Sequence, residues 1–275
     1  MAQHESIDGI VIRARDMGDH DRYLTVLTAE RGRITILAKG GRSLKGPQVA
    51  VSQLYTYSNL EYYRRGDFNV LKGGSTIENF YGLASDMDRL NLAAYLCELA
   101  AELTDEGEEA GEMLRLLLNS LHAVSRGLYP IEQVKGAFEM RAAAVSGYEP
   151  DLSGCSRCGR TTAEPFYLDV MNGALECPEC LAKAGKQART GDYADEIREA
   201  EIIARLPMAA VAAMRYCLHA PLNRLFAFEL TDPEDLARFA KHAETYLLSH
   251  IGHGFESLRF YHEMREGTPP AKKGT

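Results

Sequence analysis

The sequence predicts an α+β protein with more than one domain. It would begin with a small five-stranded barrel and continue into a helical domain that carries a four-cysteine, zinc-binding insertion. Three observations lead to this prediction. Apolar and polar residues alternate over the first 80 residues, apolar residues recur at helical spacing from about residue 85, and two Cys-x-x-Cys pairs interrupt the helical part. A chain of 275 residues has room for about two domains.

Alternation of period two, typical of half-buried β-strands, marks five segments of the N-terminal region. They cover residues 10–15, 22–28, 33–39, 54–63 and 68–72. The connection Glu30-Arg31-Gly32 is short enough for a hairpin. Five antiparallel strands can close a Greek-key barrel of the OB-fold type, and the period alone does not distinguish that barrel from an SH3-like one.

Apolar stripes at helical spacing follow the barrel region. They predict helices near residues 90–103, 113–124 and 131–145, and further helices near 192–204, 207–219, 232–250 and 255–265. We therefore expect a barrel over 1–80, a helical domain in two parts over 81–150 and 186–265, the cysteine insertion over 151–185, and a disordered tail over 266–275.

The four cysteines of the insertion have the spacing of a zinc site. Cys155 and Cys158 form one pair, and Cys177 and Cys180 form the second after 18 intervening residues. Two such pairs complete a tetrahedral shell of four thiolates, which leaves no open position for a substrate water, so we expect one structural zinc ion and no metal catalysis. The sequence FYLDVMNGALEC between the pairs indicates a hairpin that turns at Asn172-Gly173.

The charge of the chain is divided unevenly. The formal net charge is −8, yet residues 31–60 contain no Asp or Glu while carrying several Lys and Arg. Such a basic stretch either protects a strand edge from aggregation or binds an anion.

Three segments resemble the RecO recombination mediators. These are GIVIRARDMGDHDRYLTVLTAERGRITILAKGGRS near the N-terminus, FEMRAAAVSGYEPDLSGCSRCG at the first cysteine pair, and FESLRFYHEM near the C-terminus. The resemblance implies an OB-fold barrel, a helical domain and a structural zinc site. It also implies a non-enzymatic activity in DNA repair and recombination: binding of single- and double-stranded DNA, annealing of complementary strands, and cooperation with RecR to load RecA onto strands coated by the single-strand binding protein SSB.

Binding of single strands requires cations for the phosphates and aromatic rings for the bases. The candidate cations are Arg13, Arg15, Arg33, Lys39, Arg42 and Lys45. The candidate stacking residues are Tyr55, Tyr57 and Tyr63, which would otherwise fill the barrel core. Family members can also bind the acidic, Phe-ended tail of SSB on the helical domain. Lys135 and Arg141 are the candidates for that contact, although an Arg at the margin of an apolar stripe usually snorkels or pairs with an acid.

The sequence gives little support for an enzyme. It contains no phosphate-binding loop of the G-x-x-x-x-G-K-[ST] type, no H-E-x-x-H and no G-x-S-x-G motif. An alternative of another class is a zinc-containing adaptor that binds proteins and contacts DNA only incidentally. The absence of a secretory signal and of any apolar run of ~20 residues favours a cytoplasmic, nucleoid-associated protein without a membrane segment.

Overall fold

The computed structural model describes residues 4–42, 48–188 and 203–265. They form two compact units. The first combines the chain up to Leu128 with the chain from Phe255 onward, and the second comprises Tyr129–Gly254. The expected tail over 266–275 lies outside the described residues.

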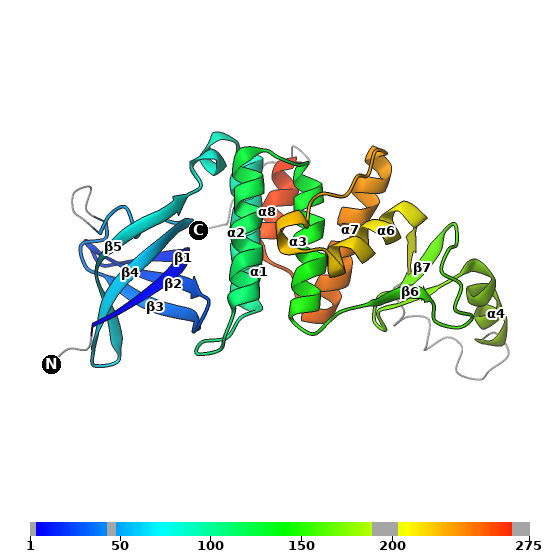
Figure 1. Cartoon of the computed structure of the whole chain (residues 1–275), viewed down its shortest axis with the longest axis horizontal. Helices are drawn as coiled ribbons and strands as arrows, with labels where there is room; N and C mark the ends of the chain where they lie inside the picture. Colours follow the sequence, from blue (N-terminus) through cyan, green and yellow to red (C-terminus); the bar gives the residue numbers. More distant parts are fainter. Residues whose placement is uncertain (1–3, 43–47, 189–202, 266–275) are drawn as a thin grey trace, which may run out of the picture. The chain divides into compact units, whose positions relative to one another are not determined.

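The N-terminal strands form a closed barrel (Figure 1). The strands are β1 (His4–Met17), β2 (Asp21–Thr28), β3 (Gly32–Ala38), β4 (Thr56–Arg65) and β5 (Phe68–Asn79). Their order around the barrel is β1-β2-β3-β5-β4, with β3 and β5 parallel and β4 paired back to β1. This is the connectivity of an OB-fold, so it resolves the ambiguity left by the alternation, and the predicted fold class is confirmed.

The barrel interior is filled by the residues that the alternation predicts to face inward. Leu24, Val26, Ile34 and Ile36 are all at least 94% buried in one apolar cluster. Tyr62 of β4 joins this cluster, and its hydroxyl donates to Glu5 at 3.0 Å. Side chains on the opposite face of the same strands therefore point out of the barrel.

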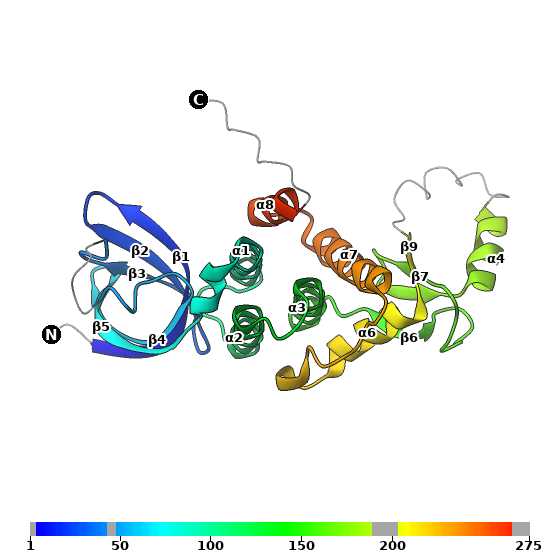
Figure 2. The same ribbon diagram turned by 90° about the horizontal axis from the view of Figure 1, so that it is seen from above.

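The first unit also contains a short 3₁₀ helix, η1 (Tyr81–Ser85), and the helices α1 (Met87–Glu102), α2 (Gly111–Arg126) and α8 (Glu256–Arg265). The Asp86 side chain caps α1 by accepting from the Asp88 N–H at 2.9 Å. Helix α8 returns to α1, beside which it lies in Figure 2. Its Ser257 donates through both N–H and hydroxyl to Glu98 of α1, so the C-terminal helix is joined to the barrel unit.

In the second unit, α3 (Ile131–Val145) is the central helix. It packs against α6 (Met208–His219) and α7 (Pro233–Ile251) (Figure 2). A Cβ added at Gly136 would lie 2.6 Å from the Phe239 ring, so glycine permits the close approach of α3 to α7. The short helix η2 (Leu222–Arg224) follows α6.

The cysteine insertion of this unit forms a helix and three strands of a small sheet, which β9 completes from further along the chain. The strands β6 (Asp151–Cys155), β7 (Phe166–Asp169), β8 (Ala174–Glu176) and β9 (Ile203–Leu206) pair in the order β6-β8-β7-β9, and α4 (Pro178–Ala188) follows β8. The hairpin predicted at Asn172-Gly173 is present, with Gly173 at φ 61°.

Strand β9 differs from the sequence-based expectation of a helix over residues 192–204. Residues 192–202 lie outside the described part of the chain, but 203 and 204 belong to the strand. Ala204 and Leu206 are buried while Ile203 and Arg205 are exposed, which is strand periodicity over a run too short to exclude a helix from sequence. No helix in the described residues is long and apolar enough to cross a membrane.

Candidate nucleic-acid interface and metal centre

The outward side of β1, β2 and β3 presents two rows of side chains across the sheet. In the first row Arg13 pairs with Thr25 and Thr25 with Thr35; in the second Arg15 pairs with Tyr23 and Tyr23 with Leu37. We call these six residues, together with Lys39 just beyond the end of β3, the outer face. All of them are exposed or half-buried, since the inward neighbours occupy the core.

The cations of the outer face are available to a ligand. Within the described parts of the chain, neither Arg15 nor Lys39 lies at ion-pair distance from a carboxylate, and both are exposed. The Arg13 side chain is 58% exposed, and its guanidinium is 4.0 Å from the Glu98 carboxylate, at the limit of an ion pair. An exposed ion pair of this kind contributes little to stability, so Arg13 can exchange Glu98 for a phosphate at a low cost in free energy.

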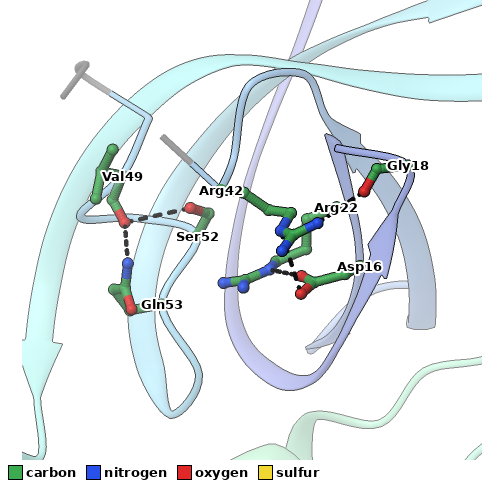
Figure 3. A network of polar contacts seen from close by, with 7 residues as sticks. All are labelled: Asp16, Gly18, Arg22, Arg42, Val49, Ser52 and Gln53. Carbon is green, nitrogen blue, oxygen red and sulfur yellow. Dashed lines mark hydrogen bonds and ion pairs between the residues drawn. The ribbon is translucent and has the colours of Figure 1, made fainter. Parts of the chain in front are cut away.

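Arg42 is engaged within the protein instead, as Figure 3 shows. Its Nε lies 3.3 Å from Asp16, which Arg22 also contacts at 2.8 Å, and its Nη1 donates to the Gly18 carbonyl at 2.7 Å. These contacts fix the segment after β3 against the connection between β1 and β2. Lys45 lies outside the described residues.

The same close-up contains a second group of contacts, in the turn that precedes β4. There Ser52 and Gln53 both donate through their side chains to the Val49 carbonyl, at 3.2 and 3.0 Å. They stabilise the turn over residues 48–53, shortly before β4.

Arg33 faces outward from β3 but lies against the acidic loop between α1 and α2. Its N–H donates to the Asp105 carbonyl at 3.2 Å, and its guanidinium lies 4.0 Å from the Asp105 carboxylate. A Cβ on Gly32 would lie 2.0 Å from the same carbonyl, so the β2–β3 turn and this loop are in direct contact. Arg31, in that turn, pairs with Glu5 at 2.6 Å. Arg31 therefore has a close partner inside the protein, whereas the guanidinium of Arg33, like that of Arg13, lies at the limit of an ion pair.

The tyrosines proposed for stacking are not gathered on the outer face. Tyr57 and Tyr63 point outward from β4 and are half-buried, while the residue that fills the core is their neighbour Tyr62. Tyr55 precedes the strand and has φ 61°. The aromatic ring that lies between Arg15 and Leu37 is Tyr23, which sequence reasoning did not select, although alternation already placed it opposite the inward Leu24.

Lys135 and Arg141 lie inside the second unit. Lys135 is 3% exposed and contacts Glu139 at 2.7 Å and Glu244 at 2.5 Å. Arg141 is 8% exposed and donates to the carbonyls of Cys217 and Ala220, at the C-terminal end of α6. Both cations thus stabilise the packing of α3 against its neighbours, and neither is placed to receive an acidic peptide tail.

The four cysteines come together at one end of the insertion. Cys155 ends β6, Cys158 lies in the turn after it, Cys177 follows β8, and Cys180 is in the first turn of α4. Their sulfur atoms all lie within 4.8 Å of one another, and those of Cys158 and Cys177 are 3.8 Å apart. A tetrahedral zinc site with bonds of ~2.3 Å requires sulfur atoms ~3.8 Å apart. The donor set therefore fits a metal ion.

The local backbone geometry positions the first pair of thiols and favours ionisation of Cys155. Gly159, at φ 71°, donates to the Cys155 carbonyl at 2.8 Å and so closes the turn. Burial acts to raise the pKa of Cys155, but the N–H groups of Cys177, Cys158 and Arg157 lower it to about 6. The first thiolate thus forms readily.

The remaining thiols are harder to ionise in the absence of a cation. Hydrogen bonds with the thiols of Cys177 and Cys158 raise the pKa of Cys180 to about 12. Four adjacent thiolates need a dication to be stable together, which is the arrangement that a bound metal ion satisfies.

Comparison with known proteins connects these features to a family. The family model described as "Recombination protein O N terminal" matches residues 1–80, and "Recombination protein O C terminal" matches residues 84–190. The "DNA repair protein RecO" of Pelotomaculum thermopropionicum is 30% identical over 267 residues, which are 97% of this chain and 96% of that protein. Proteins of the same description from Acetivibrio thermocellus and Listeria monocytogenes serotype 4b are each 28% identical, over 252 and 269 residues. These cover 92% and 98% of this chain, and 94% and 98% of the relatives.

Proposed function

Since the chain belongs to the RecO family of DNA repair and recombination proteins, we propose that it binds single- and double-stranded DNA without sequence specificity and anneals complementary strands. Together with RecR it would load RecA onto single strands coated by SSB, a role without enzymatic catalysis, in the cytoplasm at the nucleoid. The family membership and the outer face of the barrel support this proposal.

The outer face carries the observation on which the proposal rests. Arg13, Arg15 and Lys39 border a surface that also contains the Tyr23 ring and the apolar Leu37. Cations beside an aromatic and apolar surface are what a single strand needs, because phosphates meet the charges and bases stack on the ring. Contacts to the DNA backbone and stacking on bases do not depend on the base sequence. This agrees with a mediator that acts on any damaged DNA.

The cysteine site is proposed to hold one zinc ion with a structural role. Cys155, Cys158, Cys177 and Cys180 would be its ligands, and four thiolates leave no coordination position for chemistry. The ion would hold β6, β8 and α4 together at the end of the insertion. The acidic tail of SSB, if it binds this chain directly, requires cations other than Lys135 and Arg141, because both are buried among protein partners.

A binding and annealing assay tests the proposal. We expect labelled single strands to bind more tightly at low than at high salt, because each neutralised phosphate releases counterions. We also expect complementary strands coated with SSB to anneal faster with the protein than without it. A protein adaptor with incidental DNA contact would bind strands weakly at both salt concentrations and leave the annealing rate unchanged.

A further inference from the structure

A pocket of 250 Å³ opens beside the outer face, within the barrel unit. It lies between β1, the residues just before β4, and α1, with Ser257 of α8 at its edge. Ala94, Cys97 and Ala101 of α1 form an apolar wall. The volume is below the ~300–1,000 Å³ typical of sites for larger ligands, so it suits a single ring.

Tyr55 lines this pocket in a strained backbone conformation. Its φ of 61° is in the left-handed region, which a bulky side chain adopts only when the surrounding structure imposes it. The Tyr55 N–H donates to the Val11 carbonyl at 2.8 Å, which holds the residue there. The aromatic ring of Tyr55 is therefore held in the pocket lining. Residues with backbone strain of this kind cluster at functional sites.

The polar groups of the pocket point to a nucleic-acid ligand. Arg13 belongs both to the pocket lining and to the outer face, so the two surfaces are continuous. The Glu98 carboxylate accepts from Ser257 and remains 30% exposed, which leaves acceptor capacity for a further N–H. Every nucleobase carries an N–H on its Watson–Crick edge, so such an acceptor would not select one base.

We propose that this pocket receives one unstacked base of a single strand whose phosphates follow the outer face. The inference rests on the proposed function and adds a specific site to it. Tyr55 would stack on the base, the α1 wall would cover its other side, and Arg13 would contact the adjoining phosphate. A peptide side chain fits the apolar wall as well, but the continuity with Arg15 and Lys39 matches a polyanion better than a peptide.

Filling the pocket tests this site. Ala94→Leu and Ala101→Leu each add volume to the wall at half-buried positions of α1, and leucine is a good helix former. The matched control is Ala212→Leu, at an exposed position of α6. The probes are an oligothymidylate and an abasic strand of equal length, which share their phosphates and differ in their bases. Melting temperatures equal to that of the wild type establish that the variants fold.

The wild type and the control should prefer the oligothymidylate over the abasic strand, because bases stack both on Tyr23 and in the pocket. Each filled variant should reduce that preference about tenfold, the scale of stacking one base, and should keep the wild-type affinity for the abasic strand. A preference as large as that of the wild type in both filled variants would overturn the inference and leave the pocket to a peptide side chain. An equal loss of affinity for both strands would overturn it too. A wild type that binds neither strand would instead refute the proposed function.

Discussion

Replacing Lys135 by methionine should lower the free energy of unfolding of the second unit by about 3–5 kcal/mol. The ammonium group of Lys135 lies between the carboxylates of Glu139, which is 0% exposed, and Glu244. Methionine matches the aliphatic part of the lysine chain but removes the positive charge that lies between the two carboxylates. Denaturant unfolding followed by circular dichroism measures the change.

The matched control for this change is Lys241→Met. Lys241 is exposed on α7, in the same unit, so the same substitution there should change the stability by less than about 0.5 kcal/mol. Wild-type stability of Lys135→Met would contradict the structural role of the buried lysine and reopen its assignment to an acidic partner.

Removing the metal should unfold the cysteine insertion and little else. We expect purified protein to contain about one zinc ion per chain, and Cys177→Ser to contain none. Hydrogen exchange over residues 151–185 should then become faster by orders of magnitude, because the bound ion would hold β6, β8 and α4 together. The barrel strands should keep their protection, since none of them contributes a ligand.

A cysteine outside the cluster provides the control for metal content. Cys217 is buried in α6 and is not among the four clustered thiols, so Cys217→Ala should retain the full zinc content. A Cys177→Ser protein that still bound one zinc ion per chain, with unchanged exchange in the insertion, would refute the proposed ligand set.

Local patterns were sufficient to predict the barrel and the metal site. In β3, Ile34 and Ile36 face the core and alternate with outward residues, as the sequence predicts. The alternation is local, because successive side chains of any strand point to opposite faces of the sheet. The cysteine spacing likewise predicts the cluster, because the ligands of each pair come from one turn. The end of the expected helix at 203–204 was wrong because a stretch as short as IARL, residues 203–206, fits both the helical and the strand period.

Whether an individual cation is available or paired depends on acidic residues that are distant in the sequence. The stretch from Arg31 contains no acids along the chain, yet the pairing of β1 with both β4 and β2 and the return of the α1–α2 loop bring Glu5, Asp16 and Asp105 to its arginines. The partner of Lys135, Glu244, is likewise 109 residues away. No local pattern contains these pairings, so sequence could propose the basic residues but not separate the available ones from the paired ones.

The most direct test of the outer face compares two double variants. Arg15→Ala with Lys39→Ala removes two cations that have no carboxylate partner in the described residues, and Arg31→Ala with Arg42→Ala removes two that form ion pairs at 2.6 and 3.3 Å. The measurement is the slope of log affinity for single-stranded DNA against log salt concentration. The first variant should reduce the slope by about 1.4, from ~0.7 per lost phosphate contact, and the second should keep the wild-type slope. An unchanged slope in the first variant would contradict the assignment of DNA binding to the outer face.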